Sequence, residues 1–217
     1  MPTLCILTAH NSRYEEIAAI SAPFMRRLAD AHGYTYTALR RDDCVRDAGW
    51  IKIEPILDVL SSGNFDFLLW LDADAVPVRT DVDVLTVARS DADLHMAWHR
   101  PLAQTTNDPP HYNTGVMLIR ASDWSRRFFE AVWQVGPLPH RWKDQAAIHR
   151  VLGYDGVLGL GEDRDDEQNR RHVGRIGDAW NSIPGVCFAD DPIILHYAGI
   201  PDLDYRAKLM RDGSGGR

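Results

Sequence analysis

The stretch FDFLLWLDADAVPV, residues 65–78, decides the fold, because an apolar run ends there at two aspartates one residue apart. The run 67–71 is short, continuous and bounded by turn-forming residues, which predicts a buried β-strand. Side chains alternate along an extended backbone, so we expect Asp72 and Asp74 on one side and Ala73 on the other. In open α/β sheets the carboxyl end of a strand, where this pair lies, is the place where ligands bind.

The two carboxylates predict a cation site. Two acids on one side of a strand end repel each other unless they share a cation. Hard oxygen ligands suit Mg²⁺ or Mn²⁺, and these ions commonly take substrate phosphates as further ligands. The pair therefore indicates a phosphorylated substrate held by a metal ion. The alternative is a solvated turn after the strand, since the D-x-D pattern is common by chance.

Strands and helices alternate through the first third of the chain. Apolar runs predict strands over residues 3–9, 34–39 and 67–71, and helical spacing predicts helices over 14–32 and 50–60. This β-α-β-α-β order predicts an α/β fold with a mostly parallel central sheet flanked by helices. Pro23 predicts a kink or break in the first helix. The same patterns predict later strands over 94–98, 115–119 and 193–195 and later helices over 122–135 and 143–152.

Length and composition are those of an ordinary globular domain. The 217 residues are enough for one domain that buries roughly 70% of its unfolded surface. A net charge of −7 offers no general basic field for nucleic acid or anionic membrane. The three cysteines are odd in number and lack metal-binding spacing, which favours a reducing, cytoplasmic location. We also expect no membrane span and no signal peptide.

Two segments differ in composition from the rest of the chain. Residues 161–175 contain five acids and four arginines with almost no apolar side chain, which predicts a mobile lid or, alternatively, a disordered insertion. Residues 211–217, RDGSGGR, are flexible by composition. We expect one domain over residues 1–200 and a C-terminal helix and tail over 201–217, flexible at its end.

Four further residues have side chains that suit a site at the D-x-D pair. His196 follows a buried strand and is either a third metal ligand or a hydrogen-bonded structural histidine. Asn113 precedes a predicted strand and can bond sugar hydroxyls, although Asn-Thr-Gly is also ordinary loop sequence. Asp144 suits a helix N-terminus, where it is either functional or a cap. Lys52 either contacts a diphosphate or is a solvated lysine.

Taken together and in this order, several sequence blocks resemble a family of glycosyltransferases. They are ILTAHNSRY near the start, HGYTY at 32–36, W-I-K at 50–52, WLDADAVPV at 70–78, NTGVMLIRASDWSRRFF at 113–129, KDQAAIHRVL at 143–152 and HYAG at 196–199. The chain resembles the retaining family of GT-A fold that includes plant xyloglucan xylosyltransferases and fungal galactosyl- and mannosyltransferases. The resemblance covers most of residues 3–200 and implies a single Rossmann-like GT-A domain.

The resemblance also implies roles for individual residues. Metal ligands would be Asp72, Asp74 and His196, holding Mn²⁺ or Mg²⁺ on the diphosphate of a nucleotide-sugar, with a UDP-sugar favoured. Donor-binding residues would be Thr8, Ala9, His10, Lys52, Asp72, Ala73, Asp74 and Asn113. Asp144 and Gln145 would flank the anomeric carbon as catalytic residues. The family often has a lysine five or six residues after the ligand histidine; Pro201 and Asp202 stand there, and Arg206 or Lys208 is the candidate replacement.

The sequence therefore predicts a metal-dependent glycosyltransferase that transfers a sugar with retention to a hydroxyl acceptor. The acceptor is a glycan, a lipid-linked sugar, a protein or a hydroxylated nucleobase. For retention we expect same-face attack with the Gln145 carbonyl oxygen stabilising the sugar cation, and Asp144 is the candidate for a covalent adduct.

Three other functions share some of these sequence features. A nucleotide-sugar-binding module without activity is compatible with the absent lysine. A sugar nucleotidyltransferase normally has a glycine-rich phosphate loop after its first strand, and residues 8–12 contain no glycine. A phosphatase would usually carry its Asp-x-Asp pair at the first strand, whereas here the pair follows the third.

Overall fold

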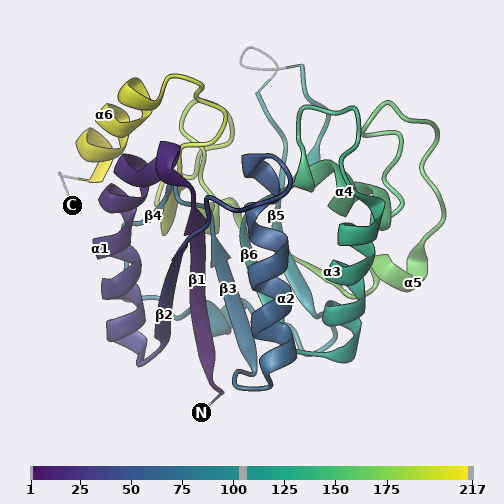
Figure 1. Ribbon diagram of the computed structural model, residues 1–217, viewed down its shortest axis with the longest axis horizontal. Coiled ribbons are helices and arrows are strands. Elements are labelled where there is room, and N and C mark those ends of the chain that lie inside the picture. Colours follow the sequence, from purple (N-terminus) through teal and green to yellow (C-terminus); the bar gives the residue numbers. More distant parts are fainter. Residues whose placement is uncertain (1, 103–106, 215–217) are drawn as a thin grey trace.

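A six-stranded sheet forms the centre of the computed structural model, which describes residues 2–102 and 107–214 (Figure 1). The strand order is β2-β1-β3-β6-β5-β7, and neighbouring strands are parallel except that β6 runs against both β3 and β5. The strands are β1 (Leu4–His10), β2 (Thr35–Arg40), β3 (Phe67–Leu71), β5 (Leu94–His99), β6 (His111–Arg120) and β7 (Val173–Ile176). The predicted α/β fold with a mostly parallel sheet is confirmed.

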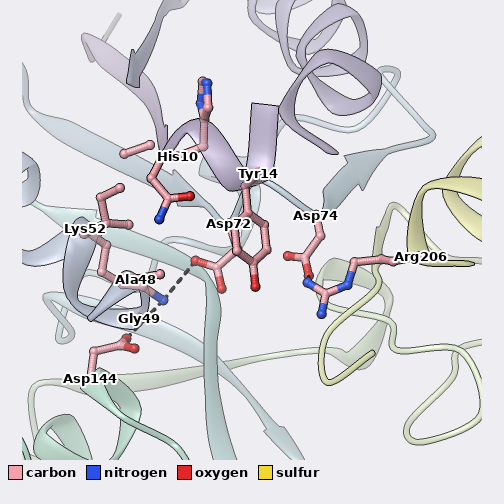
Figure 2. Close-up of a pocket in the computed structure, with 13 residues that line it drawn as sticks. His10, Tyr14, Ala48, Gly49, Lys52, Asp72, Asp74, Asp144 and Arg206 are labelled. Carbon is pink, nitrogen blue, oxygen red and sulfur yellow. Dashed lines mark hydrogen bonds and ion pairs between the residues drawn. The ribbon is translucent and has the colours of Figure 1, made fainter. Parts of the chain in front are cut away.

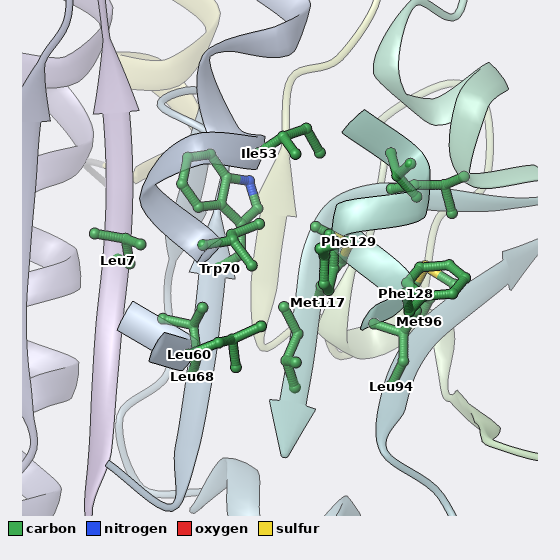
Figure 3. Close-up of a cluster of buried hydrophobic side chains, with 14 of the residues drawn as sticks. Leu7, Ile53, Leu60, Leu68, Trp70, Leu94, Met96, Met117, Phe128 and Phe129 are labelled. Atoms are coloured by element: carbon green, nitrogen blue, oxygen red, sulfur yellow. The ribbon is translucent and has the colours of Figure 1, made fainter. Parts of the chain in front are cut away.

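Helices cover both faces of this sheet, which explains why the run 67–71 is apolar throughout. Leu68 and Trp70 are buried in the core on one face, and Leu69 and Leu71 in the core on the other. Figure 3 shows the first of these cores, between the sheet and two of its helices. The first face is covered by α2 (Ile53–Ser62), α3 (Asp123–Val135) and α4 (Asp144–Val151), and the second by α1 (Glu15–His32), η3 (Val84–Val87) and η4 (Asp178–Trp180).

The predicted elements agree with the structure except in a few places. α1 continues through Pro23, so the predicted break is wrong. Buried residues on both sides of Pro23 outweigh the cost of about 3 kcal/mol for a proline in a helix, since Met25 packs on the central sheet and Ala18 packs in the cluster with a second, two-stranded sheet and the C-terminal helix. The helix expected over 50–60 begins instead with the 3-10 turn η2 (Ala48–Lys52).

The charge-dense segment 161–175 is folded onto the domain and lines neither of the cavities described below, so the prediction of a disordered insertion is wrong. It contains the short helix α5 (Glu167–Arg170), and its last residues form part of β7, which pairs with β5 at the edge of the sheet. The Arg170 guanidinium donates to the carbonyls of Leu152 and Gly153 at 2.9 and 2.8 Å. These contacts anchor the segment to the loop after α4, and its closure as a lid when donor binds stays a prediction.

The C-terminal helix α6 (Leu203–Ser214) lies beside α1 (Figure 1). Ala207 and Met210 of α6 are buried in one cluster with Ile17 and Ala18 of α1. Residues 211–214, expected to be flexible, form the last turn of α6, and residues 215–217 lie outside the described residues. Among the residues that the structure describes, no helix has the length and apolar character needed to cross a bilayer.

Candidate functional site

Two adjoining cavities, of about 170 and 560 Å³, open at the carboxyl ends of β1 and β3. Figure 2 shows residues that line the smaller one. Both are lined by Tyr14, Lys52, Asp72, Asp74, Asp144 and Arg206. The smaller also contacts Ala9, His10 and Ala73, and the larger contacts Asn113, Gln145 and His196. Thr8 is the one predicted site residue that the structure does not bring here, because its side chain is buried within β1. All the others meet at this edge of the sheet.

Asp72, Ala73 and Asp74 form a turn and do not continue β3. The strand ends at Leu71, and the N–H of Ala75 donates to the Asp72 carbonyl at 2.9 Å. The expected strand-like alternation is therefore wrong. The carboxylates converge because the chain turns here from the central sheet into β4 (Ala75–Pro77), which belongs to a second, two-stranded sheet.

One oxygen of Asp72 is bound by the protein and the other faces His196. Asp72 Oδ1 accepts a hydrogen bond from Trp70 Nε1 at 2.8 Å and lies 2.9 Å from Lys52 Nζ. Oδ2 lies 3.8 Å from His196 Nε2. The carboxylate is thus held in orientation with one oxygen directed toward the imidazole.

Asp74 is arranged in the same way. Its Oδ2 accepts from Arg206 Nη1 at 2.8 Å, and its Oδ1 lies 3.3 Å from His196 Nε2. Burial would raise the pKa of Asp74, but His196 and the Arg206 guanidinium outweigh burial and lower this pKa to about 2. Asp74 is therefore ionised at neutral pH and presents one negatively charged oxygen beside the imidazole.

His196 reaches the carboxylates from β8 (Ile194–His196), whose pairing with β4 places it opposite Ala75. Its ring lies against Gly115 of β6 so closely that a Cβ on Gly115 would stand 2.0 Å from the His196 Cε1 atom. The glycine of the Asn-Thr-Gly sequence thus makes room for the imidazole.

Lys52 lies between two acids. Its ammonium is 2.9 Å from Asp72 Oδ1 and 3.1 Å from Asp144 Oδ2, and it donates to the Thr114 carbonyl at 3.2 Å. Burial opposes its charge, but Asp144 and Asp72 together outweigh burial and raise the pKa of Lys52. Burial also raises the pKa of Asp144 to about 6, because Lys52 compensates for it only in part while Asp72 adds repulsion. One ammonium is thus shared by two carboxylates.

The start of α4 holds Asp144 and Gln145 against β6. The Gln145 side-chain Oε1 accepts from the Thr114 backbone N–H at 3.2 Å, which fixes the orientation of the amide. His149 accepts from the N–H of Tyr112 through Nε2, so its Nδ1–H donates to the Gln145 carbonyl at 2.8 Å. The first turn of α4 is therefore fixed to the strand that faces the cavity.

Lys143, immediately before α4, has an unfavourable backbone conformation. It has φ +54° and ψ −118°, and it is the one non-glycine with positive φ among the described residues. The Gln145 N–H closes a turn onto the Trp142 carbonyl at 2.9 Å, with Lys143 at the position where a type II′ turn prefers glycine. Such conformations cost about 1–3 kcal/mol and cluster at functional sites.

Lys143→Gly should therefore stabilise the protein by about 1 kcal/mol, because relief of strain exceeds the entropy cost of glycine. The variant also loses the ion pair of Lys143 with Asp47, which is solvent-exposed and contributes little. Lys143→Ala is the matched control, since it removes the same ion pair but keeps the strain. Urea unfolding checks this, and equal stability of the two variants would contradict a strained turn.

The residues at the D-x-D turn suit a divalent cation. The ligand atoms of Asp72, Asp74 and His196 all lie within 4.8 Å of one another. Two carboxylate oxygens and one imidazole nitrogen form a donor set that Mn²⁺ accepts readily and Mg²⁺ less so. Bonds to the outer carboxylate oxygens leave the inner oxygens directed at a common point.

Several lining residues were not assigned to the site from the sequence, and Tyr14 and Asn11 are among them. Tyr14 lies at the end of the 3-10 turn η1 (Ser12–Tyr14), and the guanidinium carbon of Arg206 is 5.7 Å from the centre of its ring. Asn11 follows β1 and lines the smaller cavity. Both lie in the block ILTAHNSRY near the start of the chain, a signal that could have identified them. Of the two candidates for the absent lysine, Arg206 is at the site, whereas Lys208 is exposed.

No protein-family model matches this chain, and no curated protein matches it. Solved structures do match. A glycosyltransferase involved in the glycosylation of the major capsid of PBCV-1 aligns with TM-score 0.73 and 15% identity over 97% of this chain and 100% of its own. An active-site mutant of LgtC aligns with TM-score 0.54 and 13% identity, covering 97% of this chain and 95% of its own.

A third match is the glycosyltransferase GlyE of Streptococcus pneumoniae TIGR4. It has TM-score 0.57 and 12% identity over 98% of this chain and 65% of its own. The chain therefore has the GT-A fold of glycosyltransferases. The narrower resemblance to xylosyl-, galactosyl- and mannosyltransferases of plants and fungi stays a prediction.

Proposed function

We propose that this protein is a metal-dependent glycosyltransferase that moves a sugar from a nucleotide-diphospho-sugar to a hydroxyl acceptor. The observation that carries the proposal is the convergence of Asp72 Oδ2, Asp74 Oδ1 and His196 Nε2 at a strand end of a GT-A fold. Lys52 and Arg206 bind the other oxygen of Asp72 and of Asp74, respectively, and so lie at the same turn. This arrangement fits a diphosphate, which needs a divalent cation and further positive charge.

In this proposal the three ligand residues hold Mn²⁺ or Mg²⁺. When bound, the ion supplies Lewis acidity to the diphosphate as the glycosidic bond breaks. Lys52 and Arg206 contribute further positive charge to the leaving group. Arg206 thereby takes the place of the lysine that the family often has after the histidine.

The nucleotide occupies the smaller cavity, against Ala9, His10 and Ala73, and we favour a UDP-sugar. The sugar and the acceptor meet in the larger cavity, near Asn113, Asp144 and Gln145. A glycan, a lipid-linked sugar, a protein or a hydroxylated nucleobase is the acceptor. A cytoplasmic location stays part of the proposal and rests on the cysteine content.

Retention is proposed from the chemistry beside the donor. Gln145 offers an amide, which is a poor base and a poor nucleophile, so same-face attack fits better than inversion. One lone pair of its Oε1 binds the Thr114 N–H, and the other is available to the sugar cation. Asp144 has a pKa raised to about 6, so it can also carry a proton near neutral pH.

The test is donor binding and donor hydrolysis with and without Mn²⁺. We expect a nucleotide-sugar to raise the melting temperature only when Mn²⁺ is present, and the diphosphate to be released slowly. Asp74→Asn should weaken donor binding by more than about 10-fold, because it removes a ligand oxygen with its charge. Asp81→Asn is the matched control, since Asp81 pairs with Arg79 on the surface.

Tight binding of a nucleotide-sugar by Asp74→Asn in EDTA would overturn the metal assignment. Metal-dependent donor binding that leads neither to hydrolysis of the donor nor to transfer of the sugar to any acceptor in a glycan panel would favour the nucleotide-sugar-binding module. Exchange of pyrophosphate into the donor would instead indicate a sugar nucleotidyltransferase.

A further inference from the structure

Asn181 lies behind the proposed ligand histidine, on the side away from the cavities. It follows η4 and is completely buried. Its side-chain Oδ1 is 2.8 Å from His196 Nδ1, whereas the opposite ring nitrogen, Nε2, faces Asp72 and Asp74. Asn181 therefore contacts the imidazole without reaching the carboxylates.

A chain of hydrogen bonds connects His196 to the backbone of β6. The Gly115 N–H donates to Asn113 Oδ1 at 2.9 Å. Asn181 Nδ2 donates to the same oxygen at 2.9 Å. Asn181 Oδ1 then meets His196 Nδ1. Asn113, Asn181 and His196 are buried, and Gly115 lies in the buried part of β6.

The direction of every bond in this chain follows from its first member. A backbone N–H can only donate, so the Asn113 atom that it meets must be the oxygen. The Asn181 atom beside that oxygen must be the NH₂ group, because two oxygens would repel each other. The Asn181 oxygen is then the atom at His196, and the ring nitrogen that it meets must carry a proton. The backbone of Gly115 thus dictates which tautomer the imidazole adopts.

We propose that Asn181 is a positioning residue that keeps the proton of His196 on Nδ1, so that Nε2 presents its lone pair to the metal. The inference rests on the proposed metal-dependent function. Without Asn181, Asp74 Oδ1 at 3.3 Å and Asp72 Oδ2 at 3.8 Å would draw the proton to Nε2. A cation would then have to displace that proton before it could bind.

The first experiment reads the tautomer directly in metal-free protein. In ¹⁵N-histidine-labelled wild type, long-range ¹H–¹⁵N spectra of the neutral ring should show His196 with a protonated Nδ1 and an unprotonated Nε2. Asn181→Leu should shift the proton to Nε2. Asn113→Asp is the conservative control, because one carboxylate oxygen can accept from both Gly115 N–H and Asn181 Nδ2 and so keeps the Nδ1–H tautomer. A protonated Nε2 in neutral wild-type His196 would overturn the inference.

The second experiment measures the metal. Binding of Mn²⁺ in the presence of UDP, followed by electron paramagnetic resonance of free Mn²⁺, should weaken by about 10–100-fold in Asn181→Leu. Unchanged binding in a variant whose tautomer has shifted would also overturn the inference. If wild type binds no Mn²⁺ with UDP while its Nδ1–H tautomer is present, the proposed function fails and the hydrogen-bond chain stands. If Asn181→Leu does not fold, the ¹H–¹⁵N spectrum of wild-type His196 alone decides the inference.

Discussion

Gly115→Ala should abolish Mn²⁺-dependent donor binding and with it any transfer activity. The new Cβ would stand 2.0 Å from Cε1, 2.6 Å from Nε2 and 2.7 Å from Nδ1 of His196, so the imidazole has to leave its place. The His196 side chain is only 2% exposed and has no room to move without disturbing its neighbours. We expect affinity for Mn²⁺ with UDP to fall by about 100-fold or more, since a ligand is displaced.

The backbone itself tolerates the alanine, because Gly115 has no positive φ, although it lies where the pairing of β6 with β5 shifts register between Met96 and Ala97. The steric clash should lower stability by about 1–3 kcal/mol, the usual cost of overpacking. Gly177→Ala is the matched control. A Cβ at Gly177 meets nothing within 4 Å, and its φ is −68°. This control should keep both stability and Mn²⁺ binding.

A double variant identifies the partner in the clash. Gly115→Ala with His196→Ala should recover the stability that Gly115→Ala alone loses, because the truncated side chain leaves space for the new methyl group. Metal binding should stay lost. Chemical unfolding of the four proteins of this cycle gives the interaction energy. Additive losses would mean that the alanine acts elsewhere than on the imidazole.

The sequence predicted the fold well because the decisive elements are buried on both faces. Phe67–Leu71 is apolar throughout for that reason, and such a run is readable without knowledge of its partners. Polar residues with the right chemistry follow such runs at Asp72, Asp74 and His196, and the structure brings all three together. Site residues placed at strand ends are the ones that a pattern can identify.

The features of the site that the sequence did not predict depend on contacts between segments far apart in the chain. The contact between Gly115 and His196 joins residues of two different sheets, and no spacing in the sequence encodes it. Arg206 was only one of two candidates, because the packing of α6 on α1 decides which side chain points inward. Asn181 was not identified at all, since a single asparagine carries no signal until its partners are known.

Predictions made from local sequence were wrong where tertiary contacts outweigh local preferences. α1 passes through Pro23 because its apolar face is buried on both sides of the proline. The 161–175 segment contributes to an edge strand although it is highly charged, because its charges bind backbone carbonyls and acids nearby. In both cases interactions with distant segments outweigh a preference that composition alone suggests.

Lys52→Met should lower the free energy of unfolding by about 3–5 kcal/mol at pH 8, because it leaves the buried Asp144 carboxylate and its neighbour Asp72 without their shared cation. Methionine keeps the length of the buried stem, so the loss is electrostatic and not a matter of packing. The Lys52 side chain is only 5% exposed, so the ion pairs that it makes lie largely outside bulk water. Urea unfolding across pH measures the loss.

The pH dependence distinguishes this explanation from a general disturbance. A carboxyl whose folded-state pKa is raised loses stability as pH rises from its unfolded value through the folded value. In wild type this window for Asp144 runs from 3.8 to about 6. Removing Lys52 takes away a group that lowers the pKa of Asp144, so the window should extend upward and the deficit should be smaller at pH 4.5 than at pH 8. Lys52→Met with Asp144→Asn should remove most of the pH dependence, because the amide mimics the protonated acid. A deficit of equal size at both pH values, or one that the second substitution leaves unchanged, would show that Lys52 stabilises the fold by some means other than the shared ion pair.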